Sequence, residues 1–86
     1  MIDSAACTAL LLGSGVNPAS TIEYEINGTI RTVTLQWIID AFMQGSEETK
    51  TLFFSSLKKI TETKNPLALK EYFENMGKLL ILSKTN

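Results

Sequence analysis

The sequence has no histidine and one cysteine, Cys7, among its 86 residues. A chain without histidine has neither a His-dependent catalytic triad nor a histidine-ligated metal site. One cysteine forms no internal disulfide and no cysteine-based zinc site. The Cys7 thiol also has no lysine or arginine within 20 residues along the chain to activate it. We therefore expect Cys7 to be a packed apolar residue, and we expect no catalytic residue, no metal and no cofactor.

Excess charge of one sign is also missing, and so are long apolar runs. The chain carries eight Lys+Arg and nine Asp+Glu residues, and the net charge of −1 disfavours a dedicated nucleic-acid binder. The longest apolar runs, such as Leu79 to Leu82, have four residues, whereas a membrane span needs ~20. The N-terminus lacks the basic and apolar segments of a secretory signal. We expect a cytoplasmic protein that does not enter a membrane.

The remaining composition is that of an ordinary globular chain. Hydrophobic residues make up 44% of the sequence and charged residues 20%, which argues against disorder. A length of 86 residues suits one domain, and a domain of this size buries only about 60–65% of the surface that its unfolded chain exposes. No repeat or linker interrupts the sequence. We expect residues 1–86 to form a single compact domain with a thin margin of stability.

A β-hairpin is the clearest local pattern. Residues 21–26 alternate between β-formers and acidic residues, which places the apolar side chains on one face. The next dipeptide, Asn27-Gly28, is well suited to the positive φ angles of a type I′ turn. The β-branched segment 29–33 then returns as the second strand, with Arg31 opposite Tyr24. An isolated hairpin is marginal in water, so its apolar face must pack on helices.

Two short helices flank the hairpin in the sequence. The first spans Ala5 to Leu12 after a cap at Asp3 or Ser4. The second spans Leu35 to about Gln44 after a cap at Thr34, and it is apolar over most of its circumference. Such a helix lies either at the centre of a core or at a surface shared with a partner.

Two further helices complete the chain. The third follows a cap at Ser46, and the fourth starts at Asn65-Pro66, which suits an N-cap and a first helical position. Gly77 leaves two alternatives: the fourth helix continues to about Leu82, or it stops and residues 78–82 form a third strand. One interior glycine costs a helix only about 1 kcal/mol, which favours the continuous helix. The fold class is therefore α+β, with a short N-terminal helix, a β-hairpin, and three helices packed on one face of the hairpin.

Two patterns that suggest chemistry have simpler interpretations. Gly13-Ser14-Gly15 resembles the start of a phosphate-binding loop, but it lacks the third glycine and the preceding strand, and we interpret it as a helix stop. Glu23 and Glu25 lie roughly 7 Å apart on one strand face, which suits a solvated face better than an acid/base pair. A small-ligand-binding protein that uses the glycine turn and the aromatic residues remains an alternative function.

A second alternative is a small DNA-binding transcriptional regulator. The strand 29–34 followed by two helices resembles the arrangement of ribbon-helix-helix repressors, in which paired strands of a dimer enter the major groove. Against it, Asn27-Gly28 pairs this strand within its own chain, and Arg31 is the single arginine. The basic edge available for such binding comprises Lys58, Lys59, Lys64 and Lys70.

The leading hypothesis is a non-enzymatic protein–protein interaction module, such as an adaptor, an assembly factor or a small inhibitor. The helices carry more apolar surface than so short a chain needs, and small domains commonly gain stability by oligomerising. We therefore expect a protein partner and self-association as a homodimer. Trp37 and Phe54 lie off the main apolar stripes of their helices, and tryptophan is enriched at binding hot spots. The expected interface residues are Trp37, Phe42, Met43 and Phe54.

Overall fold

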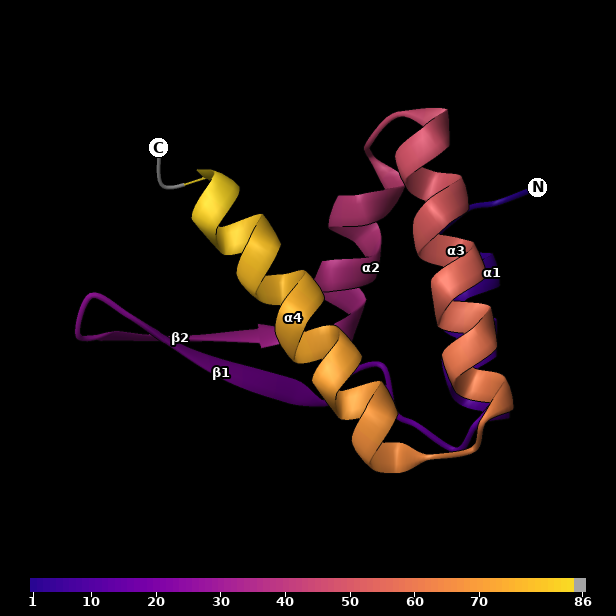
Figure 1. Ribbon diagram of the computed structural model, residues 1–86, viewed down its shortest axis with the longest axis horizontal. Coiled ribbons are helices and arrows are strands. Elements are labelled where there is room, and N and C mark those ends of the chain that lie inside the picture. The colour runs from indigo at the N-terminus through magenta and orange to yellow at the C-terminus, as the bar shows by residue number, and fades with distance from the viewer. Residues whose placement is uncertain (85–86) are drawn as a thin grey trace.

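The computed structural model describes residues 1–84, which form four helices and one β-hairpin (Figure 1). The predicted α+β class and the order of its elements are confirmed. In chain order the elements are α1 (Ser4–Gly13), β1 (Thr21–Ile26), β2 (Thr29–Thr34), α2 (Leu35–Met43), α3 (Glu47–Glu62) and α4 (Pro66–Lys84). Over this part of the chain, no helix combines the length and the apolar composition that crossing a bilayer requires.

The hairpin has the predicted turn and register. Asn27 and Gly28 adopt φ angles of 53° and 79°, the left-handed values that a type I′ turn needs. The strands pair antiparallel, with Tyr24 opposite Arg31. Because side chains alternate between the two faces of a strand, this register places Tyr24 and its apolar neighbours on the face that meets the helices.

Each helix begins at a polar cap that the sequence predicts. A side-chain oxygen of the cap accepts a hydrogen bond from a first-turn amide, which satisfies one of the free N–H groups at the helix start. Asp3 rather than Ser4 caps α1. The acceptor–donor pairs are Asp3 with Ala6 at 2.9 Å, Thr34 with Trp37 at 3.0 Å, Ser46 with Thr49 at 3.1 Å, and Asn65 with Leu67 at 3.1 Å.

The last helix runs without interruption through Gly77 to Lys84, so the alternative third strand at 78–82 is wrong. Gly77 sits where α4 crosses the hairpin and α2. A Cβ atom at this position would collide with the Tyr24 hydroxyl and lie 2.9 Å from Cδ1 of Ile38. The glycine therefore permits close packing of the helix rather than ending it.

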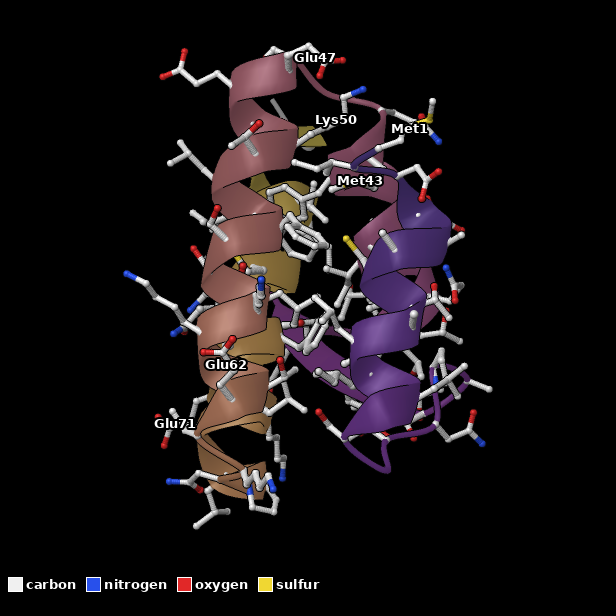
Figure 2. All side chains as sticks on the ribbon, turned by 90° about the vertical axis from the view of Figure 1, so that its right-hand side faces the viewer. Met1, Met43, Glu47, Lys50, Glu62 and Glu71 are labelled. Carbon is white, nitrogen blue, oxygen red and sulfur yellow. The ribbon has the colours of Figure 1, made fainter. Side chains whose placement is uncertain are left out.

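The helices form one core with the hairpin at its side. In the structure α2 packs against β2 and α4 against β1, while α3 packs against α1, α2 and α4. Figure 2 shows α3 and α1 side by side, with side chains filling the space between them. The buried apolar residues come from every element: Cys7, Leu11, Ile22, Tyr24, Val33, Leu35, Ile38, Ile39, Phe53, Leu57, Leu69, Phe73 and Ile81.

Gly77→Ala tests whether close packing decides the residue at this position. Alanine favours a helix by about 1 kcal/mol over glycine, but overpacking costs about 1–3 kcal/mol. We expect a net loss in the free energy of unfolding, measured by urea denaturation. Gly13→Ala is the matched control, because nothing lies within 4 Å of a Cβ at Gly13. A gain in stability for Gly77→Ala would contradict this packing.

Candidate functional site

Three of the four predicted interface residues lie on α2 (Trp37, Phe42 and Met43), and the fourth, Phe54, lies on α3. All four are half-buried and pack against the edge of the core. The structure thus leaves part of each side chain at the surface while the rest contributes to folding. At 100° per residue, Phe42 and Met43 do not share the side of α2 from which Trp37 projects.

Phe42 and Met43 have clear packing partners. The Phe42 ring stacks on Phe53 of α3 with centroids 4.6 Å apart and planes 10° from parallel. The sulfur of Met43 accepts a weak hydrogen bond from the Cys7 thiol at 3.9 Å, which joins α2 to α1. Both side chains therefore hold α2 against its neighbouring helices.

The aromatic rings pack on one another. Phe53 lies 5.7 Å from Tyr72 and 6.4 Å from Phe73, between ring centroids. The Tyr72 hydroxyl also donates a hydrogen bond to the Phe53 carbonyl at 3.3 Å, and burial raises the pKa of Tyr72 to about 12. These contacts assign the rings to the packing of α2, α3 and α4. Of the three residues, Phe73 also lines a cavity of about 230 Å³.

Trp37 has a different setting from the other three residues. At 100° per residue it projects from α2 away from Leu35, Ile38 and Ile39, which are the buried residues of that helix. The Arg31 guanidinium of β2 lies over its ring, with Cζ 5.3 Å from the centroid, in cation–π geometry. A half-buried aromatic ring and the guanidinium of an exposed arginine thus form a surface feature, which we call the Arg31–Trp37 pair.

The outer face of the hairpin carries an apolar side chain that sequence reasoning did not single out. Ile30 is 65% exposed and pairs across the strands with Glu25. The alternation of the hairpin was the signal that could have found it, because Ile30 takes a position on the polar face. Leu12, Leu52, Leu67 and Leu79 are also exposed by more than half, on α1, α3 and α4.

Acidic side chains gather between β1 and α4. Glu23 and Glu25, which the sequence singled out, line a cavity of about 380 Å³ together with Glu71 and Glu74 of α4. Lys78 is the basic residue of this lining. Within residues 1–84 no three carboxylates, thiols or imidazoles converge in a metal-binding arrangement. The effect of the cluster is a negative potential along β1.

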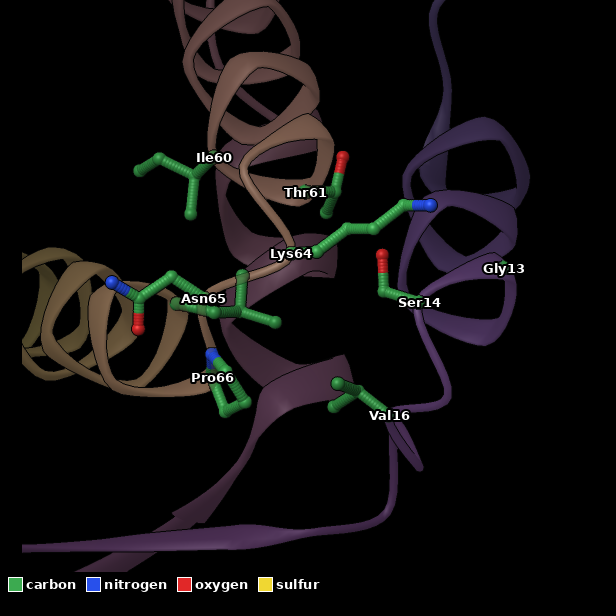
Figure 3. Close-up of a pocket in the computed structure, with 9 residues that line it drawn as sticks. Gly13, Ser14, Val16, Ile60, Thr61, Lys64, Asn65 and Pro66 are labelled. Carbon is green, nitrogen blue, oxygen red and sulfur yellow. The ribbon is translucent and has the colours of Figure 1, made fainter.

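The glycine turn lines a second cavity, of about 360 Å³, between α1 and the α3–α4 junction (Figure 3). Figure 3 shows the Lys64 side chain extending toward α1. The Ser14 and Gly15 amides donate hydrogen bonds to carbonyls of α1, at 3.0 Å each. These amides are engaged in ending the helix, at the negative end of its dipole, and this arrangement does not favour a phosphate group.

The Cys7 thiol is fully buried. Burial, with a smaller contribution from the Asp3 carboxylate, raises the pKa of Cys7 from 9.0 to about 11. Its thiol is therefore protonated at neutral pH, and the structure supports the expectation of a packed small residue.

Comparisons with protein-family models, curated proteins and solved structures find no match to this chain.

The raised pKa of Cys7 predicts loss of stability at alkaline pH. Below pH 9 the thiol is protonated in both states, so this contribution is fully present. As the pH rises from 9 to about 11, the unfolded chain ionises first and the free energy of unfolding falls. We expect urea titrations to show this fall, and we expect Cys7→Ala to reduce it between these pH values. Equal pH slopes for the two proteins over that interval would contradict the assignment.

Proposed function

We propose that the chain is a non-enzymatic protein–protein interaction module that self-associates as a homodimer. The observation that carries the proposal is the Arg31–Trp37 pair. Trp37 is half-buried on the side of α2 that points away from the core residues of that helix, and Arg31 lies over its ring. Tryptophan and arginine are among the residue types most enriched at binding hot spots.

The apolar surface outside the core also supports an interaction role. Residues from every element already fill the core, while Ile30 and four leucines remain more than half exposed. Single exposed apolar residues are common on soluble proteins, so they add support only in combination with the Arg31–Trp37 pair. For a domain of 86 residues, covering part of this surface by association would add stability that the small core cannot supply.

Native mass spectrometry of the purified protein at two concentrations tests self-association. We expect a dimer mass that persists on dilution. A monomer at both concentrations would overturn the homodimer, and protein binding would then depend on a different partner captured in a pull-down. Extra mass from a retained small molecule would favour the ligand-binding alternative.

Trp37→Ala tests the role of the tryptophan. If the ring is an interface hot spot, its removal costs association about 2 kcal/mol or more, which raises the dimer dissociation constant about 30-fold or more. We expect a smaller effect on the unfolding free energy of the monomer, measured by urea denaturation at a concentration below the dissociation constant. Leu67→Ala, on an exposed leucine of α4, is the control. Unfolding of the Trp37→Ala monomer would assign the ring to the core instead.

A further inference from the structure

Within residues 1–84 the hairpin is a two-stranded sheet, so each strand has one edge without a neighbouring strand from this part of the chain. In a hairpin with a two-residue turn, the pair next to the turn exchanges hydrogen bonds and the pairs then alternate. The register makes Tyr24 and Arg31 a bonded pair, and Glu25 and Ile30 a non-bonded pair. The backbone N–H and C=O groups of Ile30 and Thr32 therefore point outward from β2. Within residues 1–84, no hydrogen bond engages them.

The surroundings of the hairpin leave its turn end accessible. In Figure 1 this end projects beyond the helices, to the left of α4. The β2 segment has no proline or lysine, which are residues that proteins commonly use to block pairing at a sheet edge. Its one charged residue, Arg31, lies on the inner face over Trp37. The outward N–H and C=O groups of β2 are thus placed to pair with another strand.

Charge distinguishes the two edges. Along β1 the residues with outward backbone groups include Glu23 and Glu25, and α4 adds Glu71 and Glu74 nearby. Antiparallel pairing of β1 with a second β1 would place carboxylates opposite carboxylates, which is destabilising. At the matching positions β2 carries Ile30 and Thr32, which are uncharged and β-branched. The β2 edge is therefore the one that is complementary to its own copy.

We propose that β2 pairs antiparallel with β2 of a second copy of this chain, so that two hairpins form one four-stranded sheet. This inference rests on the proposed function and names the surface through which the homodimer forms. The arrangement is a closed two-fold contact in which both copies use the same edge. Pairing of β2 with β1 of the next copy would instead be head-to-tail and open-ended.

The outward backbone groups restrict the register of this pairing. A two-fold axis at Arg31 would place two guanidiniums directly opposite each other, which is unfavourable. An axis at Thr32 would extend the ladder to Thr34, which already caps α2. An axis at Ile30 avoids both conflicts and places Ile30 opposite the partner's Ile30. It gives these exposed side chains an apolar contact on the outer face and leaves Arg31 opposite a threonine, the partner's Thr29.

Proline substitution tests the edge directly. In Thr32→Pro the lost N–H is one that bonds nothing within the folded monomer. With the axis at Ile30, this N–H lies opposite the partner's Gly28 at the end of the new ladder, and the two-fold contact loses it twice. Glu23→Pro is the matched control, because Glu23 is opposite Thr32 and its N–H points outward from β1. Sedimentation equilibrium measures the dimer dissociation constant, and circular dichroism checks that each variant is folded. We expect Thr32→Pro to raise the constant at least tenfold and Glu23→Pro to leave it within about twofold.

A second variant keeps the test informative if Thr32→Pro does not fold. Ile30→Lys leaves the backbone unchanged and places two charges at the two-fold axis, so we expect the same loss of dimer. Leu67→Lys, at another exposed apolar residue, is its control. Dimerisation that neither Thr32→Pro nor Ile30→Lys weakens would overturn the strand pairing. If Trp37→Ala still dissociates that dimer, the proposed function stands; a wild-type monomer would overturn the strand pairing and the homodimer together.

A disulfide reports the register. Opposed residues in a hydrogen-bonded antiparallel pair have Cα atoms about 5.5 Å apart, within the range that a disulfide spans. In a Cys7→Ser background, Ile30→Cys should oxidise to a covalent dimer in non-reducing electrophoresis. Glu25→Cys is next to Ile30 on the same face of the hairpin but should remain monomeric, because its copies are separated by two intervening strands. Equal cross-linking of the two variants would contradict the Ile30 axis.

Discussion

The contact between Tyr24 and α4 fixes the β-hairpin against the helices. The Tyr24 hydroxyl donates a hydrogen bond to the Phe73 carbonyl at 2.7 Å, and the ring end occupies the space that Gly77 leaves open. Burial, followed by the nearby Glu74 carboxylate, raises the pKa of Tyr24 to about 12, so the hydroxyl keeps its proton. A hairpin is marginal on its own, and this contact fixes its inner face against the last helix. The position of β2, and therefore of its open edge, depends on it.

Most of the fold follows from local chemistry in the sequence. Asn27-Gly28 determines the turn, alternation in 21–26 determines the register, and polar caps determine where the helices begin. The path of the chain at Gly77 could not be decided in the same way. Its cause is the approach of Tyr24, which is distant in sequence, and a glycine that ends a helix looks the same in sequence as one that makes room for a neighbour.

The candidate site was predictable only in part. Trp37 stands out in the sequence because it departs from the apolar stripe of its helix, and the structure places it accordingly. Its contact with Arg31 depends on the angle between β2 and α2, and no local pattern encodes that angle. Phe42 shows the opposite difficulty, since its stacking on Phe53 makes it a contributor to helix packing as well as a surface residue. How much of one side chain is buried and how much is exposed depends on the tertiary packing around it.

Among residues 1–83 the core contains no buried polar or charged residue, apart from the hydroxyl that Tyr24 directs to a backbone carbonyl. Apolar cores accept volume-conserving exchanges among aliphatic residues at small cost, so most core identities are free to drift over evolution. Tyr24 and Gly77 cannot be replaced in this way. The Tyr24 hydroxyl bonds a backbone carbonyl, and the space at Gly77 admits no side chain. Distant relatives would therefore be recognised by a tyrosine before an Asn-Gly turn and a glycine within the final helix. Overall sequence identity in the core would be weaker evidence of homology.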